Sequence, residues 1–238
     1  MQANIFNSLN GADGSREVYV ASKVVTGTFA CDPIVIAAAP TEYSTTEATL
    51  IITNTATHKG MSTSHDNKQY VHPLYIRMAV NTISSAAARV QYVSYLDNTN
   101  RYSSGGTALT SVSTYVDSRA NWQSRTPKAL VYFGAITAAA ESTEDLQVGV
   151  GLIKDATMVV GDVYEIRFDG SGVGNIANLN DATNGGHYSV NHMPVHIGPG
   201  CSYLLHLILP SAATNGAQFW VEVGYLETGH PRRRDTTD

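Results

Sequence analysis

The chain has 238 residues and a formal net charge of −5, and only 15% of its residues are charged, against about 25% in an average globular domain. Hydrophobic residues make up 43% of the chain and are spread evenly along it, which excludes an intrinsically disordered protein. The most apolar run, residues 203–209, is far shorter than the roughly 20 residues that a membrane-spanning helix needs, so we expect no membrane partner.

Patterns typical of β-strands recur along the chain, and most show the apolar–polar alternation of a half-buried strand. In chain order, the predicted strands lie near residues 17–24, 48–52, 89–95, 129–136, 146–150, 164–168, 203–209 and 218–225. In the third of these, the alternation changes phase at Val93-Ser94-Tyr95, which predicts a β-bulge. The run at 203–209 is apolar on both faces except at His206, which is typical of a central strand.

The segments between these strands carry turn-forming residues, such as Asn184-Gly185-Gly186 and Gly198-Pro199-Gly200. Helical periodicity is limited to two short candidates, at residues 112–122 and 138–141. About eight to ten strands, with no repeat and no linker, predict a single all-β domain, an antiparallel two-sheet jelly-roll sandwich. An immunoglobulin-like sandwich fits less well, because it has about seven strands in about 100 residues.

The predicted domain spans residues 16–230, with an N-terminal arm at 1–15 and a short polar C-terminal tail at 231–238. Its predicted core consists of apolar residues from the strands that alternate or are apolar throughout. These residues are Val20, Leu50, Ile52, Tyr92, Val131, Ile166, Leu205, Leu207, Val221 and Val223.

Three histidines, His187, His192 and His196, lie close together in the sequence. On an extended strand, positions 192 and 196 share a face, which makes His192 and His196 the candidate ligands of a metal ion. Met193-Pro194 interrupts such a strand, and no Asp, Glu or Cys lies near in the sequence. We therefore expect these histidines to pack against aromatic rings and to bond with the backbone, and we predict no metal and no cofactor.

No sequence motif points to catalysis, and we predict that the chain is not an enzyme. The glycine-rich segment 169–175 lacks the following helix that a dinucleotide-binding loop requires. Cys201 lies five residues from both His196 and His206, but an odd spacing alternates between the faces of a strand. We expect Cys201 to be a core residue and, with Cys31, a free thiol rather than half of a disulfide.

The distribution of basic residues argues against direct binding to nucleic acid, which requires many Lys and Arg side chains to neutralise phosphates. The first 60 residues hold three basic residues against five acidic ones. The one basic cluster, Arg232-Arg233-Arg234, is followed at once by Asp235.

The last third of the chain is similar to the closing strands of viral and tailed-phage jelly rolls. The likeness rests on residues 194–200, the apolar run at 203–209, a polar hairpin, and the strand at 219–227. The high content of Ala, Thr, Ser and Gly and the low content of Lys also resemble those proteins. The chain departs from genome-packaging shell proteins in having no basic arm, and from tailed-phage major capsid proteins in having no segment for a long helix.

The resemblance implies a non-enzymatic capsid decoration (cement) protein on the outer surface of a virion, assembled in the host cytoplasm. It implies a homotrimer that contacts the major capsid protein or other virion proteins. Two alternatives share the architecture: a jelly-roll capsid shell protein, and a carbohydrate-binding or tail-fibre module. For the last of these, the candidate sugar-stacking residues are Tyr95, Tyr102, Tyr115 and Trp122.

The two ends of the chain are the candidate partner contacts. Residues 1–6 have neither the basic nor the apolar region of a secretory signal. The arm carries two apolar anchors, Ile5 with Phe6 and then Leu9, among Asn, Ser and Gly. It either clamps a neighbour or folds back over its own sheet edge. The candidate contact residues are Ile5, Phe6 and Leu9 in the arm and Arg232, Arg233 and Arg234 in the tail.

Overall fold

The computed structural model describes residues 16–22, 34–35, 47–56, 69–83, 89–113, 127–140, 145–168, 176–178, 185–208 and 217–229. Every element in these ranges is a β-strand, so the all-β prediction is confirmed. The first helical candidate begins inside a strand, which extends to Ser113. The rest of that candidate, the arm and the tail lie outside the described residues.

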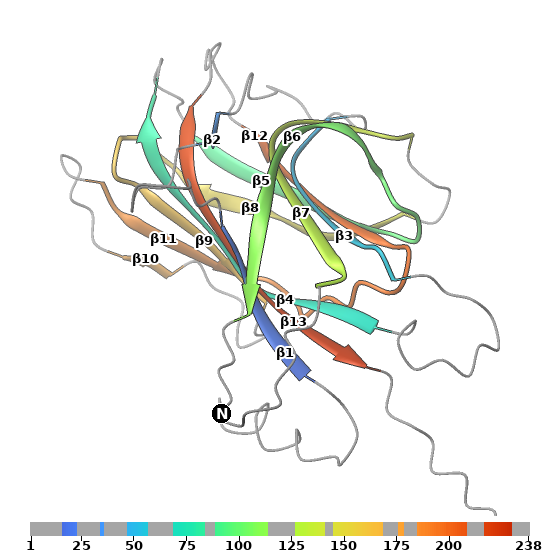
Figure 1. The fold of residues 1–238 in the computed structure, drawn as a ribbon. Helices are drawn as coiled ribbons and strands as arrows, with labels where there is room; N and C mark the ends of the chain where they lie inside the picture. The colour runs from blue at the N-terminus through green and yellow to red at the C-terminus, as the bar shows by residue number, and fades with distance from the viewer. Residues whose placement is uncertain are drawn as a thin grey trace, which may run out of the picture.

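Thirteen strands make up the described fold (Figure 1). In chain order they are β1 (Arg16–Ser22), β2 (Ile34–Val35), β3 (Glu47–Asn54), β4 (Gln69–Thr82), β5 (Val90–Asp97), β6 (Tyr102–Ser113), β7 (Ala129–Ala138), β8 (Leu146–Lys154), β9 (Val163–Arg167), β10 (Ile176–Asn178), β11 (His187–Asn191), β12 (Ser202–Ile208) and β13 (Gln218–Gly229).

The strands form two sheets. The first has the order β10-β11-β9-β4-β13-β1, and β2 pairs with the opposite end of β13 from β1. The second has the order β7-β3-β12-β5-β8. All described pairings are antiparallel except that of β9 with β11, which confirms the prediction of a two-sheet, mostly antiparallel domain.

The long strand β6 connects the two sheets. Its residues from Tyr102 to Leu109 pair with β7, and its last four residues pair with β1. Figure 1 shows this strand in green, running from β7 to the neighbourhood of β1. Gly105 and Gly106 have φ angles of 77° and 67°, a left-handed conformation that suits glycine and lets the strand curl.

The main core lies between the sheets and contains nine of the ten residues that the sequence predicts for it. The side chain of the tenth, Val20, is outside the described residues, whereas its neighbour Ala21 is fully buried in the core. A second, smaller apolar cluster lies on the outer face of the second sheet, around Ile51, Ile136 and Leu204.

One local prediction is confirmed, and another is corrected. The β12 strand pairs with β3 on one side and β5 on the other, so it is central. The sequence predicts a bulge in β5, and the β5–β8 pairing does shift register between Ser94 and Tyr95, but the extra residue is Val148 of β8. The β5 strand itself keeps an unbroken register with β12.

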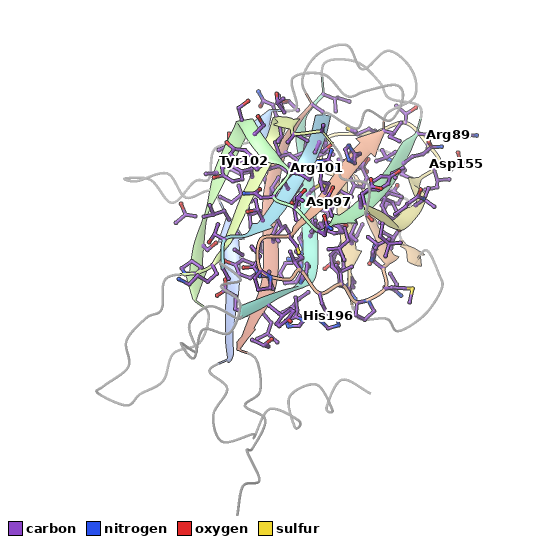
Figure 2. All side chains as sticks on the ribbon, turned by 90° about the vertical axis from the view of Figure 1, so that its right-hand side faces the viewer. Arg89, Asp97, Arg101, Tyr102, Asp155 and His196 are labelled. Atoms are coloured by element: carbon purple, nitrogen blue, oxygen red, sulfur yellow. The ribbon has the colours of Figure 1, made fainter. Side chains whose placement is uncertain are left out.

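Two buried ion pairs fix the ends of the second sheet. Arg101 donates a 2.9 Å hydrogen bond to the Asp97 carboxylate and another of 2.7 Å to the backbone oxygen of Ala139. Figure 2 labels Arg101 and Asp97. At the other end, the Lys154 ammonium lies 2.6 Å from the Asp162 carboxylate, just before β9. These pairs are almost fully buried, so each needs its partner to offset the loss of solvation.

Candidate functional site

The outer face of the first sheet carries the largest group of interacting polar side chains in the described residues. Along β9, Tyr164 and Ile166 point into the core, so the alternation of a strand turns Glu165 and Arg167 outward. Register places Arg77 of β4 opposite Glu165, and Glu222 of β13 opposite Arg77. We call this row the outer ladder, and its members are Tyr75, Arg77, Glu165, Arg167, His187 and Glu222.

Glu165 is the centre of the outer ladder. Its carboxylate accepts hydrogen bonds from Arg77 at 3.2 Å, from Arg167 at 3.0 Å and from His187 at 2.9 Å. The side chain is only 3% exposed, whereas its three partners are each exposed by nearly half. The partners therefore cover the acid while their own side chains remain partly exposed.

The electrostatics of Glu165 follow from this arrangement. Burial alone would raise the pKa of its carboxyl group, but the hydrogen bond and charge of Arg167, followed by the charge of Arg77, lower the pKa below its ordinary value. The acid is thus held ionised at neutral pH, and it fixes two guanidinium groups in place.

Tyr75 closes the other end of the outer ladder. Its ring lies over Gly224, where a β-carbon would come within 2.3 Å of the ring. Its hydroxyl donates a 2.9 Å hydrogen bond to Glu222, and the guanidinium of Arg77 lies 5.4 Å from the ring centre. Burial and this hydrogen bond raise the pKa of Tyr75 to about 12.

Further along the same face, Trp220 is held by a polar neighbour. Its indole nitrogen donates a 3.0 Å hydrogen bond to Asn81, which in turn donates to Gln218 at 3.4 Å. The face thus combines Arg, Tyr and Trp, the residue types that contribute most energy at protein interfaces.

The structure gives the two metal candidates different partners. His192 is buried, donates from Nδ1 to the carbonyl of Met193, and accepts from the Ser94 hydroxyl at Nε2, each at 2.8 Å. Burial lowers its pKa. His196 lies near the surface with its Nδ1 2.6 Å from Nδ1 of His72 (His196 is labelled in Figure 2). His192 and His196 therefore do not share a ligand position.

The pairing of His196 with His72 was not foreseen from the sequence. His72 of β4 also lies 2.7 Å from the Thr228 hydroxyl of β13. Burial, together with the nearby His196, lowers the pKa of His72 to about 4. In the described residues no group of three or more His, Cys, Asp or Glu side chains is arranged to hold a metal ion.

Cys201 is half-buried against the core, and its thiol lies 3.7 Å from the backbone oxygen of Pro199. Burial raises the pKa of the thiol. The thiol is not in a disulfide, as the sequence predicts, and Cys31 lies outside the described residues. His206 is buried on the other face of β12 beside Tyr95, so it belongs to different surroundings from Cys201.

Two of the four candidate sugar-stacking residues are in the described part of the chain. Tyr102 stacks on Tyr132 with ring centres 3.8 Å apart, so one face of its ring is already covered. Tyr95 packs edge-on against His206. Tyr115 and Trp122 lie outside the described residues, as do the arm residues Ile5, Phe6 and Leu9 and the tail residues Arg232, Arg233 and Arg234.

Comparisons with protein-family models, with curated protein sequences and with solved structures find no significant match. The class of protein that the fold defines is an all-β domain of two mostly antiparallel sheets. None of the described residues forms a helix long and apolar enough to cross a membrane.

Proposed function

We propose that the domain is a jelly roll, on the basis of the order of eight of its strands. Within the two sheets, β2-β13-β4-β9 and β3-β12-β5-β8 are consecutive neighbours. Followed along the chain, each step between these eight strands crosses from one sheet to the other, except the step from β5 to β8. Two interleaved sets of four strands in facing sheets are the pattern of a jelly roll. The other strands, β1, β6, β7, β10 and β11, extend the two sheets.

We propose further that the chain is a non-enzymatic structural protein of a virus particle, in the form of a capsid decoration protein. The strand order is the observation that carries this proposal, because jelly rolls recur in viral capsids and in lectins. This support is an analogy at the level of the fold. The outer ladder adds a surface with the Arg and Tyr side chains that protein partners bind.

Two features favour decoration of a shell over the alternatives. The acidic net charge and the few basic residues in the first 60 argue against packaging a genome. A sugar-binding module needs an open aromatic face, and the ring of Tyr102 is stacked on Tyr132. We therefore favour a trimer that sits on the capsid surface and contacts the major capsid protein.

The test is to produce the full chain alone and to measure its mass by sedimentation velocity and its form by negative-stain microscopy. A small closed oligomer, expected to be a trimer, supports decoration, and closed shells support the shell alternative instead. A monomer that gives a competable signal on a glycan array overturns the virion proposal. Locating the protein on intact particles by electron microscopy then identifies its partner.

A matched pair of variants tests whether the outer ladder is the contact surface. Arg77→Ala removes a half-exposed cation from the outer ladder, and Arg89→Ala removes a similarly exposed one that pairs with Asp155 elsewhere. Figure 2 shows Arg89 and Asp155 together at one side of the molecule. Particle binding should weaken at least tenfold in R77A and stay within twofold in R89A. Equal effects would reject the outer ladder as the contact surface.

A further inference from the structure

The β8 strand lies at one end of the described strand order, and β10 lies at the other. It pairs with β5 on one side only, among the described strands. From Leu146 to Gly151, no described backbone group forms a hydrogen bond on the other side. A row of unpaired N–H and C=O groups of this length is a template for another strand.

The sequence of β8 lacks two of the features that normally protect such an edge, although the strand has an extra residue at each of its two register shifts against β5, Val148 and Ile153. Residues 146–153 include no charged residue and no proline. Val150 is 65% exposed and Leu146 is 60% exposed. Charged side chains and proline are among the usual means of preventing edge pairing, and residues 146–153 contain neither.

The charges that follow the apolar segment do not protect it either. Lys154 turns inward to Asp162, and its ammonium also lies 4.9 Å from the ring centre of Tyr188. Asp155 is engaged by Arg89 at 2.7 Å. The other end of the strand order, β10, has only three residues, and short edge strands are a recognised safeguard.

We propose that β8 pairs with β8 of a second copy of this chain, antiparallel about a two-fold axis, so that the β3-β12-β5-β8 sheet continues across both copies. Two-fold pairing brings each residue opposite a residue of the same segment. A charge at the centre of the segment would then meet its own copy in the partner, and like charges directly opposite each other destabilise a strand pair. Because residues 146–153 carry no charge, no register of this pairing brings like charges of the segment together. The proposal rests on the edge alone and holds for any function of the chain.

Two glycines of β8 show which side of the strand is covered by its own chain. A β-carbon at Gly149 would come within 2.3 Å of His192, and one at Gly151 within 2.9 Å of the Tyr92 ring. Both glycines thus let side chains of the same copy close the inner side of β8. The outward-facing Val150 and the backbone edge are left for the partner.

The test compares Val150→Lys with Val160→Lys in the full chain. Val160 lies in the turn after β8 and is 52% exposed, so it receives the same charge outside the edge. Sedimentation equilibrium should show the smallest oligomer, expected to be the trimer, associating further as the protein concentration rises. The Kd of that step should rise at least tenfold in V150K and less than twofold in V160K. The melting temperatures of both variants, compared with that of the wild type, check that the variants fold.

Hydrogen exchange supplies a measurement specific to strand pairing. In the wild-type chain, amides of residues 146–151 should exchange more slowly at high than at low protein concentration, and V150K should abolish this difference. Equal Kd values in wild type and V150K, or exchange independent of concentration, would overturn the proposal. If the β8 contact is absent but the protein binds virus particles, the virion proposal stands and the β8 proposal is rejected. If the β8 contact is present but the protein does not bind particles, only the virion proposal is rejected.

Discussion

The Lys154 ammonium and the Asp162 carboxylate lie 2.6 Å apart and join the edge of one sheet to the start of β9 in the other. Asp162 also accepts hydrogen bonds from the Tyr164 hydroxyl and from the backbone N–H groups of Val159 and Gly186. A single carboxylate therefore holds the β8–β9 turn, the next strand and the segment before β11.

Replacing one member of this buried pair should destabilise the domain strongly. We expect Lys154→Met to lower the free energy of unfolding by about 3–5 kcal/mol, because the Asp162 charge is left buried without its cation. The control is Arg89→Met in the exposed Arg89–Asp155 pair, where the loss should stay below about 1 kcal/mol. Urea unfolding measures both, and similar values for the two variants would contradict the structural role of Lys154.

Gly149 should not tolerate a side chain. In Gly149→Ala the new β-carbon would meet Nε2 of His192 and the Ser94 hydroxyl, and such overpacking costs about 1–3 kcal/mol. Gly198→Ala is the control, because the nearest atom there is the Cys201 sulfur at an ordinary 3.4 Å. Thermal melting should show a clear loss for G149A alone. An unchanged melting temperature in G149A would mean that His192 does not pack closely on β8.

Acid should weaken the fold through Glu165. Its pKa is lower in the folded chain than the ordinary value of 4.5, so its stabilising contribution is present above pH 4.5 and is lost as pH falls through the folded pKa. We expect Glu165→Gln to be less stable than wild type at pH 7 and to approach it at pH 3. Urea midpoints at the two pH values measure this. A constant difference between the proteins would show that ionisation of Glu165 does not stabilise the outer ladder.

His72 should contribute a second, separate loss of stability at a higher pH. Its pKa falls from 6.5 to about 4 on folding, so the unfolded chain binds the proton first and stability falls as pH decreases from 6.5 towards 4. His72→Gln should reduce this slope, and His196→Gln should reduce it less, because it removes only the smaller of the two causes. Equal slopes in wild type and H72Q would contradict this assignment.

The strands with clear alternation were predictable, but two of the three longest strands, β4 and β6, were not. The 14 residues of β4 include Pro73, which is normally excluded from inner strands. Pro73 lies opposite Tyr225, beside a register shift at which β4 has an extra residue, Leu74, and such an irregularity tolerates a missing N–H donor. In β6, a run of Ser, Thr and Gly hides the pattern, because short polar side chains carry no clear period.

The outer ladder was predictable in part. The alternation around β9 places Glu165 and Arg167 on the face opposite Tyr164. Their partners Arg77 and His187 come from strands that are distant in sequence, and the pairing register that unites them is a property of the whole sheet. The same reason explains why His72 and His196, 124 positions apart, could not be paired in advance.

The curled β6 strand has a consequence for how the molecule comes apart. Its first part is hydrogen-bonded to β7 in one layer and its last part to β1 in the other. Neither sheet can therefore separate from the other unless the hydrogen bonds of β6 to β1 or to β7 break. Under a pulling force or in denaturant, the two layers should give way in one concerted event, and a half-open sandwich should not accumulate.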